Sequence, residues 1–173
     1  MKRLLFLLPL LLIFGCGGSS FDKEGFELSK NYVIEILPEV EKAYNDIGKR
    51  TPDEVDDSLL EHVKNIRAIN EKYWPDSKFG GKYEDKEIRT WKIKMDNGKD
   101  KWIIEGDELM DAIGSMYAYS EWLADDIEKM LEEPSEDNVY NLAESLHGIE
   151  NSIKELRKVF LNEKPFFEFK PRQ

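Results

Sequence analysis

Two side chains in the second half of the chain have the types and spacing of metal ligands. Glu144 and His147 lie three residues apart in a segment with helical periodicity, so both would project from one face of a helix. Glu-x-x-His supplies ligands in di-iron helix bundles, which use two such motifs and two further glutamates. The other histidine, His62, has Leu59 three residues before it, so the second motif is absent. We expect Glu144 and His147 to form a surface pair, with a mononuclear metal site as the alternative.

Aromatic residues are concentrated in the middle of the chain, where they could line a binding groove. Trp and Tyr are enriched at the places where proteins bind partners. The simpler explanation is a second small hydrophobic core, and replacement of Trp91 by alanine would separate a loss of stability from a loss of binding. The candidate groove residues are Trp74, Trp91, Trp102, Tyr119 and Trp122.

Motifs for nucleophilic catalysis and for phosphate binding are missing from the sequence. It contains no Gly-x-Ser-x-Gly, no glycine-rich phosphate loop and no His-Glu-x-x-His. Ser115 follows Gly114 but lacks the second glycine of the nucleophile motif. An acid–base enzyme that uses only carboxylates is compatible with the composition, but no motif points to one. We therefore expect a non-enzymatic protein.

The single cysteine follows an N-terminal segment that is organised like an export signal. Lys2 and Arg3 precede an apolar run at 4–14, and small residues follow it up to Ser20. This order is typical of a secretory signal peptide, and the run is shorter than the roughly 20 residues that a membrane-spanning helix needs. The sequence therefore predicts a signal peptide at 1–15.

The stretch Ile13-Phe14-Gly15-Cys16 resembles the lipobox of bacterial lipoproteins, although a small residue is usual at the place of Phe14. The resemblance implies cleavage before Cys16 and attachment of diacylglycerol to its thiol, and two acyl chains suffice for stable anchoring. It covers residues 1–16 only, and the remainder resembles no family known to us. We expect an extracytoplasmic protein attached to the cell membrane or the outer membrane, with no cofactor besides the acyl chains on Cys16.

The remainder of the chain is strongly acidic. The net charge is −11, and loss of Lys2 and Arg3 with the signal would leave 23 basic and 36 acidic side chains, a net charge of −13. Nucleic-acid binding needs patches of Lys and Arg, so we expect none. A cationic partner or ligand would suit this charge, although solubility alone also explains it. Acidic pairs, which we expect on solvated surfaces, occur at Asp56-Asp57, Asp125-Asp126 and Glu132-Glu133.

Four segments with helical periodicity must position these side chains, and we expect them to form a mainly α, four-helix bundle-like domain. The predicted helices cover about 25–47, 51–74, 107–132 and 135–162. The last two are joined by a short link and should pack antiparallel. Pro38 should kink or divide the first helix. Residues 16–24 then form a lipidated, flexible tether, and residues 25–173 form a single helical domain.

The second helix has the clearest start signal in the sequence. Thr51 is a preferred capping residue, Pro52 suits the first helical position, and Glu54 completes a capping box. The sequence predicts a helix from Pro52 that ends at Trp74, before Pro75.

The segment between the second and third helices changes to a period of two. Apolar and lysine residues alternate, and Asn97-Gly98 is the preferred pair for a two-residue hairpin turn. A hairpin folded there sets Ile93 opposite Trp102 and Trp91 opposite Ile104, on one face. We predict a β-hairpin at about 88–105, inserted between the second and third helices, with a continued helix as the alternative.

Together these features predict a membrane-anchored extracytoplasmic lipoprotein whose helical domain binds a protein or another component of the cell envelope. The alternative is a ligand- or metal-binding helical bundle that serves transport or storage.

Overall fold

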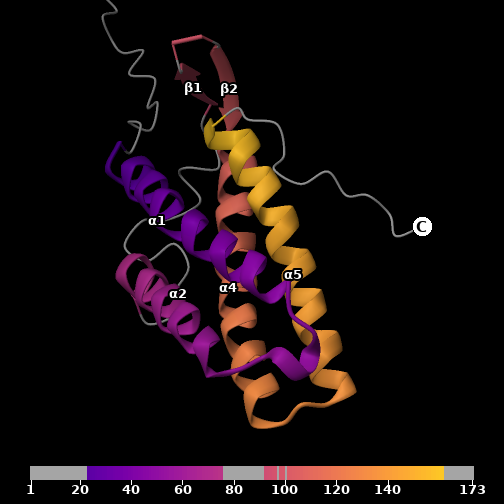
Figure 1. Cartoon of the computed structure of the whole chain (residues 1–173). Coiled ribbons are helices and arrows are strands. Elements are labelled where there is room, and N and C mark those ends of the chain that lie inside the picture. The colour runs from indigo at the N-terminus through magenta and orange to yellow at the C-terminus, as the bar shows by residue number, and fades with distance from the viewer. Residues whose placement is uncertain (1–22, 76–91, 97, 100, 162–173) are drawn as a thin grey trace, which may run out of the picture.

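Four helices pack around a common core in the computed structural model, which describes residues 23–75, 92–96, 98–99 and 101–161. They are α1 (Lys23–Ile47), α2 (Leu60–Tyr73), α4 (Gly106–Glu132) and α5 (Glu136–Leu156). α4 and α5 form a long antiparallel pair, and α1 and α2 pack against it (Figure 1). Neighbouring helices contact one another in the order α1, α2, α4, α5 and back to α1, and α1 also contacts α4. The mainly helical, bundle-like fold predicted from periodicity is therefore confirmed.

The core is built from the apolar stripes of the four helices. On α4 every residue of the predicted stripe is buried, which confirms the alternation of four- and three-residue steps as a burial pattern. These residues are Leu109, Ile113, Met116, Ser120, Leu123, Ile127 and Met130. The stripe of α5 behaves in the same way from Leu142 to Leu156, with Leu146 only partly buried.

Pro38 does not divide α1, which runs unbroken from Lys23 to Ile47. Its ring removes one backbone donor, but the buried residues on either side, Leu37 and Val40, hold the helix against the core. The helix ends where the N–H of Gly48 donates to the carbonyl of Tyr44 at 2.9 Å.

The predicted start of the second helix is wrong by eight residues. The Thr51 N–H does donate to Glu54 Oε2 at 2.8 Å, but this capping box closes only a 3-10 turn, η1 (Pro52–Glu54). Asp56 then takes an extended backbone, and its Oδ1 accepts from the Ser58 N–H at 3.0 Å. This local hydrogen bond competes with continuation of the helix. A second 3-10 turn, η2 (Asp57–Leu59), therefore precedes α2, which begins at Leu60.

The start of α5 agrees with its sequence signal, because Ser135 Oγ accepts from the Asn138 N–H at 3.2 Å. Past Leu156 the chain changes to one π-helical turn, η4 (Arg157–Leu161).

The hairpin is present, but its register differs from the prediction. Strands β1 (Lys92–Asp96) and β2 (Lys101–Glu105) pair antiparallel, with Ile93 opposite Ile104 and Met95 opposite Trp102. The connection covers 97–100 instead of two residues, with Gly98 at φ 83°. A slip of two residues keeps each side chain on its face, and Ile93 and Ile104 are both buried as expected. Trp91 lies outside the described residues.

Candidate functional site

The proposed metal ligands lie on the surface of α5. Glu144 and His147 are both exposed, and His147 Nε2 lies 3.1 Å from the amide nitrogen of Asn151. Within the described ranges no group of three or more His, Cys, Asp or Glu side chains is placed to hold a metal ion. The geometry therefore adds no third ligand to this pair.

The candidate groove aromatics are divided between core and surface. Trp74 is buried, and its ring packs edge-on against Tyr32 at a centroid distance of 5.4 Å. It is buried, but it belongs to the common core of the four helices and not to a second small core. Trp122 on α4 is 54% exposed and meets the ring of Tyr119 edge-on at 5.1 Å. Trp91 and the side chain of Trp102 lie outside the described part of the chain.

Trp122 and Glu144, proposed on separate grounds, line the same hollow between α4 and α5. This Trp122 pocket has a volume of about 370 Å³. Its other lining residues are Asp125, Asp126, Lys129, Asn141 and Ser145. The sequence alone did not predict that the two candidates would be neighbours.

A second pocket follows along the same two helices toward the hairpin. We call it the Asp111 pocket; it has a volume of about 460 Å³, and Tyr119 lies on its lining. The α4 residues that line the two pockets recur every three or four positions, so they form one stripe along the helix. We call this stripe and the facing side of α5 the α4–α5 seam. The remaining lining residues of the Asp111 pocket are Asp107, Glu108, Ala112, Ser115, Asn151, Ser152 and Glu155.

Between the two pockets, the lack of a side chain at Gly148 of α5 lets the Tyr119 ring of α4 pack against α5. A Cβ at this position would lie 2.1 Å from Cδ1 of Tyr119, so only glycine leaves room for the ring. Tyr119 thereby packs directly onto the α5 backbone and supports Trp122 from the side. The two aromatic residues are thus fixed by helix packing.

A buried hydrogen bond between α4 and α5 joins two lining residues of the Trp122 pocket. Ser145 Oγ donates to Asp126 Oδ2 at 2.6 Å, and both side chains are buried. The expectation that Asp126 is solvated is therefore wrong, because α5 covers it. Lys129 Nζ is 3.5 Å from the other oxygen of Asp126.

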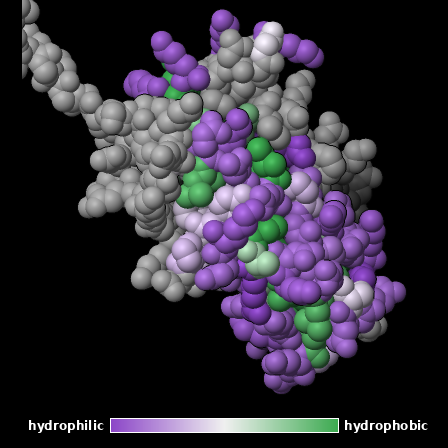
Figure 2. All heavy atoms as spheres, turned by 90° about the vertical axis from the view of Figure 1, so that its left-hand side faces the viewer, coloured by the Kyte–Doolittle hydropathy of each residue, from purple (hydrophilic) through white to green (hydrophobic). Residues whose placement is uncertain are grey.

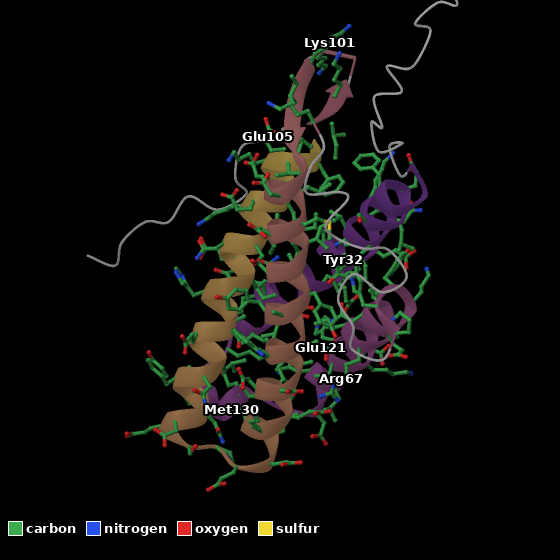
Figure 3. All side chains as sticks on the ribbon, turned by 180° about the vertical axis from the view of Figure 1, so that it is seen from behind. Tyr32, Arg67, Lys101, Glu105, Glu121 and Met130 are labelled. Atoms are coloured by element: carbon green, nitrogen blue, oxygen red, sulfur yellow. The ribbon has the colours of Figure 1, made fainter. Side chains whose placement is uncertain are left out.

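The other carboxylates of the Trp122 pocket differ in their partners. Arg67 of α2 donates to Asp125 Oδ1 at 2.8 Å. Its guanidinium group also donates to both carboxylate oxygens of Glu128 at 2.7 Å. Figure 3 shows Arg67 reaching from α2 toward α4. Glu144 makes no ion pair or hydrogen bond with any other described side chain. It is thus the carboxylate of this pocket that is open to a ligand.

A third pocket, largely apolar and with a volume of about 290 Å³, lies between α1 and η4. Its apolar lining residues are Val33, Ile34, Leu37, Pro38 and Phe160, and the charged residues Lys30, Glu41 and Arg157 complete the lining. The Ile34 side chain is 57% exposed. Figure 2, viewed from the α1 and α2 side, shows a mostly hydrophilic surface with hydrophobic side chains in small, separate patches.

The sequence analysis missed a histidine held between two carboxylates. His62 of α2 lies with Nδ1 2.7 Å from Glu39 Oε1 and Nε2 2.9 Å from Asp46 Oδ2, both on α1. Carboxylates only accept, so both ring nitrogens donate and the ring is an imidazolium. Burial lowers the pKa of His62, but the hydrogen bonds and charges of Glu39 and Asp46 outweigh it, so the pKa is raised. The signal was the seven-residue spacing of the two acids, which sets them on one helix face.

A buried polar network was also missed, and it joins three helices. The Tyr32 hydroxyl donates to Asn70 Oδ1 at 3.0 Å, and Asn70 Nδ2 donates to Ser120 Oγ at 2.9 Å and to Glu121 Oε1 at 2.6 Å. Asn70 of α2 thus links Tyr32 of α1 with Glu121 of α4, and both of these residues are labelled in Figure 3. Burial raises the pKa of the Tyr32 hydroxyl, so it stays protonated. This network has a structural role.

Cys16, the predicted signal peptide and most of the predicted tether precede the described residues. Among the helices that the structure describes, none combines the length and apolar character needed to cross a membrane. Comparison with protein-family models, with curated proteins and with solved structures found no match to this chain.

Proposed function

We propose that this chain is a membrane-anchored extracytoplasmic lipoprotein whose non-enzymatic helical domain binds a protein or another envelope component. The anchor rests on the lipobox-like segment that ends at Cys16. Labelling with a radioactive fatty acid tests it, because the Cys16→Ser variant should take up no label. Continued labelling of that variant would contradict the anchor.

The observation that supports a binding role is the exposure of Trp122. A tryptophan leaves apolar ring surface in water at a cost, and tryptophan is the residue type most enriched at the centre of binding surfaces. Here the ring is 54% exposed, is supported by Tyr119 and borders a pocket. A rigid aromatic side chain next to a recess has the properties of a contact residue.

Crosslinking in living cells tests this role. A photo-crosslinking amino acid at Asn141, on the rim of the Trp122 pocket, should capture a specific envelope partner. Trp122→Ala should abolish the capture. Tyr140→Ala is the matched control, because Tyr140 is an exposed aromatic residue of α5, at 68%, outside this pocket. Equal capture by both variants would contradict the proposed role of Trp122.

A second candidate function, a ligand-binding bundle that serves transport or storage, is favoured by the apolar pocket along α1. Its volume of about 290 Å³ is near the lower end for small-molecule sites. A medium-chain fatty acid should raise the melting temperature if this function holds, and Leu37→Trp should remove the increase by filling the pocket. No increase for the unaltered protein would count against this candidate.

A further inference from the structure

We infer that the α4–α5 seam recognises an extended cationic segment of a protein partner, whose lysine or arginine side chains pack against Trp122 and pair with Glu144. This inference rests on the proposed binding function and specifies the chemistry of its partner.

The α4–α5 seam carries an excess of negative charge, which favours a cationic partner. Four carboxylates line the Asp111 pocket and three line the Trp122 pocket, against a single ammonium group, that of Lys129. Lys158 pairs with two of the four, Glu108 at 3.1 Å and Glu155 at 3.6 Å. The remaining excess of negative charge attracts basic segments and repels acidic ones, in agreement with the net charge of the whole chain.

The aromatic side chains add apolar ring surface to the acidic surface of the seam. A Lys or Arg side chain is attracted to the face of a tryptophan ring, and its methylene groups cover apolar surface. Trp122 and Tyr119 lie at the junction of the two pockets, where both a cation and its aliphatic stem find a complementary surface. An apolar occupant would instead desolvate the carboxylates without compensating them.

The partners that each carboxylate already has indicate which carboxylate an incoming cation would pair with. Asp125 is engaged by Arg67, and Asp126 by Ser145 and Lys129. Among the described residues, no side chain pairs with Glu144, which is exposed beside Trp122. Helix α4, which carries Trp122, already binds one guanidinium group, since Arg67 contacts Asp125 and Glu128.

The length of the seam fits an extended segment. It runs along α4 from Asp107 to Lys129, about 33 Å at the helical rise. A polypeptide in extended conformation covers this length with about ten residues. Several basic side chains can therefore contact the seam at once, which suits a peptide better than a small cation.

Fluorescence anisotropy with synthetic peptides tests the inference on the detergent-solubilised full-length protein. The probe is a labelled ten-residue peptide of alternating arginine and glycine, and its partner probe carries citrulline, the neutral counterpart of arginine. We expect the arginine peptide to bind at least about tenfold more tightly, with affinity that falls as salt is raised.

Variants then locate the binding on the seam. Trp122→Ala and Glu144→Gln should each weaken binding of the arginine peptide about five- to tenfold. Tyr140→Ala and Asp137→Asn are the matched controls, because they make the same chemical changes on exposed α5 positions outside both pockets. Both controls should leave the affinity unchanged, and far-ultraviolet circular dichroism should show that all four variants stay folded.

Equal binding of the arginine and citrulline peptides would overturn the inference, as would unchanged binding by Trp122→Ala and Glu144→Gln. The cellular crosslinking experiment separates this failure from that of the proposed function. If Trp122→Ala still abolishes capture of a partner in cells, the binding role stands and only the cationic chemistry of the partner is wrong.

Discussion

Replacement of His62 by glutamine removes the cation that bridges Glu39 and Asp46, and the effect on stability should depend on pH. Glutamine keeps a donor for one carboxylate but carries no charge. The His62 side chain is 13% exposed and that of Glu39 is 11% exposed, whereas Asp46 is 48% exposed. The contact with Glu39 therefore contributes most, because water screens the contact with Asp46.

The expected loss of stability follows from these contacts. A hydrogen bond to a charged group contributes about 1.5–3 kcal/mol, and the exposed contact adds little. We expect His62→Gln to lower the free energy of unfolding by about 2 kcal/mol at pH 5.5, or the melting temperature by about 4–8 °C.

The direction of the pH dependence follows from the raised pKa of His62. The protonated ring stabilises the fold fully below pH 6.5, the ordinary value of the group, and this contribution is lost as the pH rises through the folded-state pKa. The difference between the unaltered protein and His62→Gln should therefore shrink from pH 5.5 to pH 9. The pKa of Asp46 is lowered by its hydrogen bond to His62, so this carboxylate stays charged across that window.

Urea unfolding followed by tryptophan fluorescence at pH 5.5, 7 and 9 measures the difference. His147→Gln is the matched control, since the exposed His147 contacts only Asn151 among the described residues and its replacement should cost little at any pH. A cost for His62→Gln that stays constant or grows with pH would refute the assignment of an imidazolium between two carboxylates.

Three other outcomes are expected from the packing of the helices. Gly148→Ala should lower the free energy of unfolding by about 1–3 kcal/mol in urea titrations, because its Cβ overlaps the Tyr119 ring; an unchanged midpoint would contradict that close approach. Asn70→Leu should cost about 1–3 kcal/mol in the same assay by leaving the buried Tyr32 hydroxyl without its acceptor, and a neutral result would show that the hydroxyl finds another. Zinc should leave the melting temperature unmoved, whereas an increase that is lost in His147→Gln would establish the Glu-x-x-His pair of α5 as a metal site.

Helix positions and buried faces could be predicted from the sequence because periodicity reports burial directly. The alternating steps from Leu109 to Met130 identify every core residue of the α4 stripe, including the polar Ser120. Boundaries were less predictable where local hydrogen bonds compete with the helix. Asp56 binds the Ser58 N–H and delays α2, although the capping box upstream forms as expected.

Local sequence signals did not determine the register of the hairpin or the arrangement of the candidate site. Asn97-Gly98 is compatible with both a two-residue and a four-residue connection, and each choice keeps the apolar residues on one face. The meeting of Trp122 with Glu144 depends on how closely α5 approaches α4. That distance is set by Gly148 and the Tyr119 ring, which the sequence does not place side by side.

The Tyr32–Asn70–Ser120 network restricts how α1, α2 and α4 can be aligned along their axes. The apolar stripes repeat at nearly equal steps, so a slide of α2 by one turn would still bring hydrophobic residues together. Such a slide would separate the Asn70 amide from the Tyr32 hydroxyl and from Ser120 Oγ at once, and leave the buried Tyr32 hydroxyl and Asn70 amide without these partners. The network thus penalises every shifted arrangement far more than it strengthens the native one, and it selects a single alignment of α1, α2 and α4 among several of similar hydrophobic content.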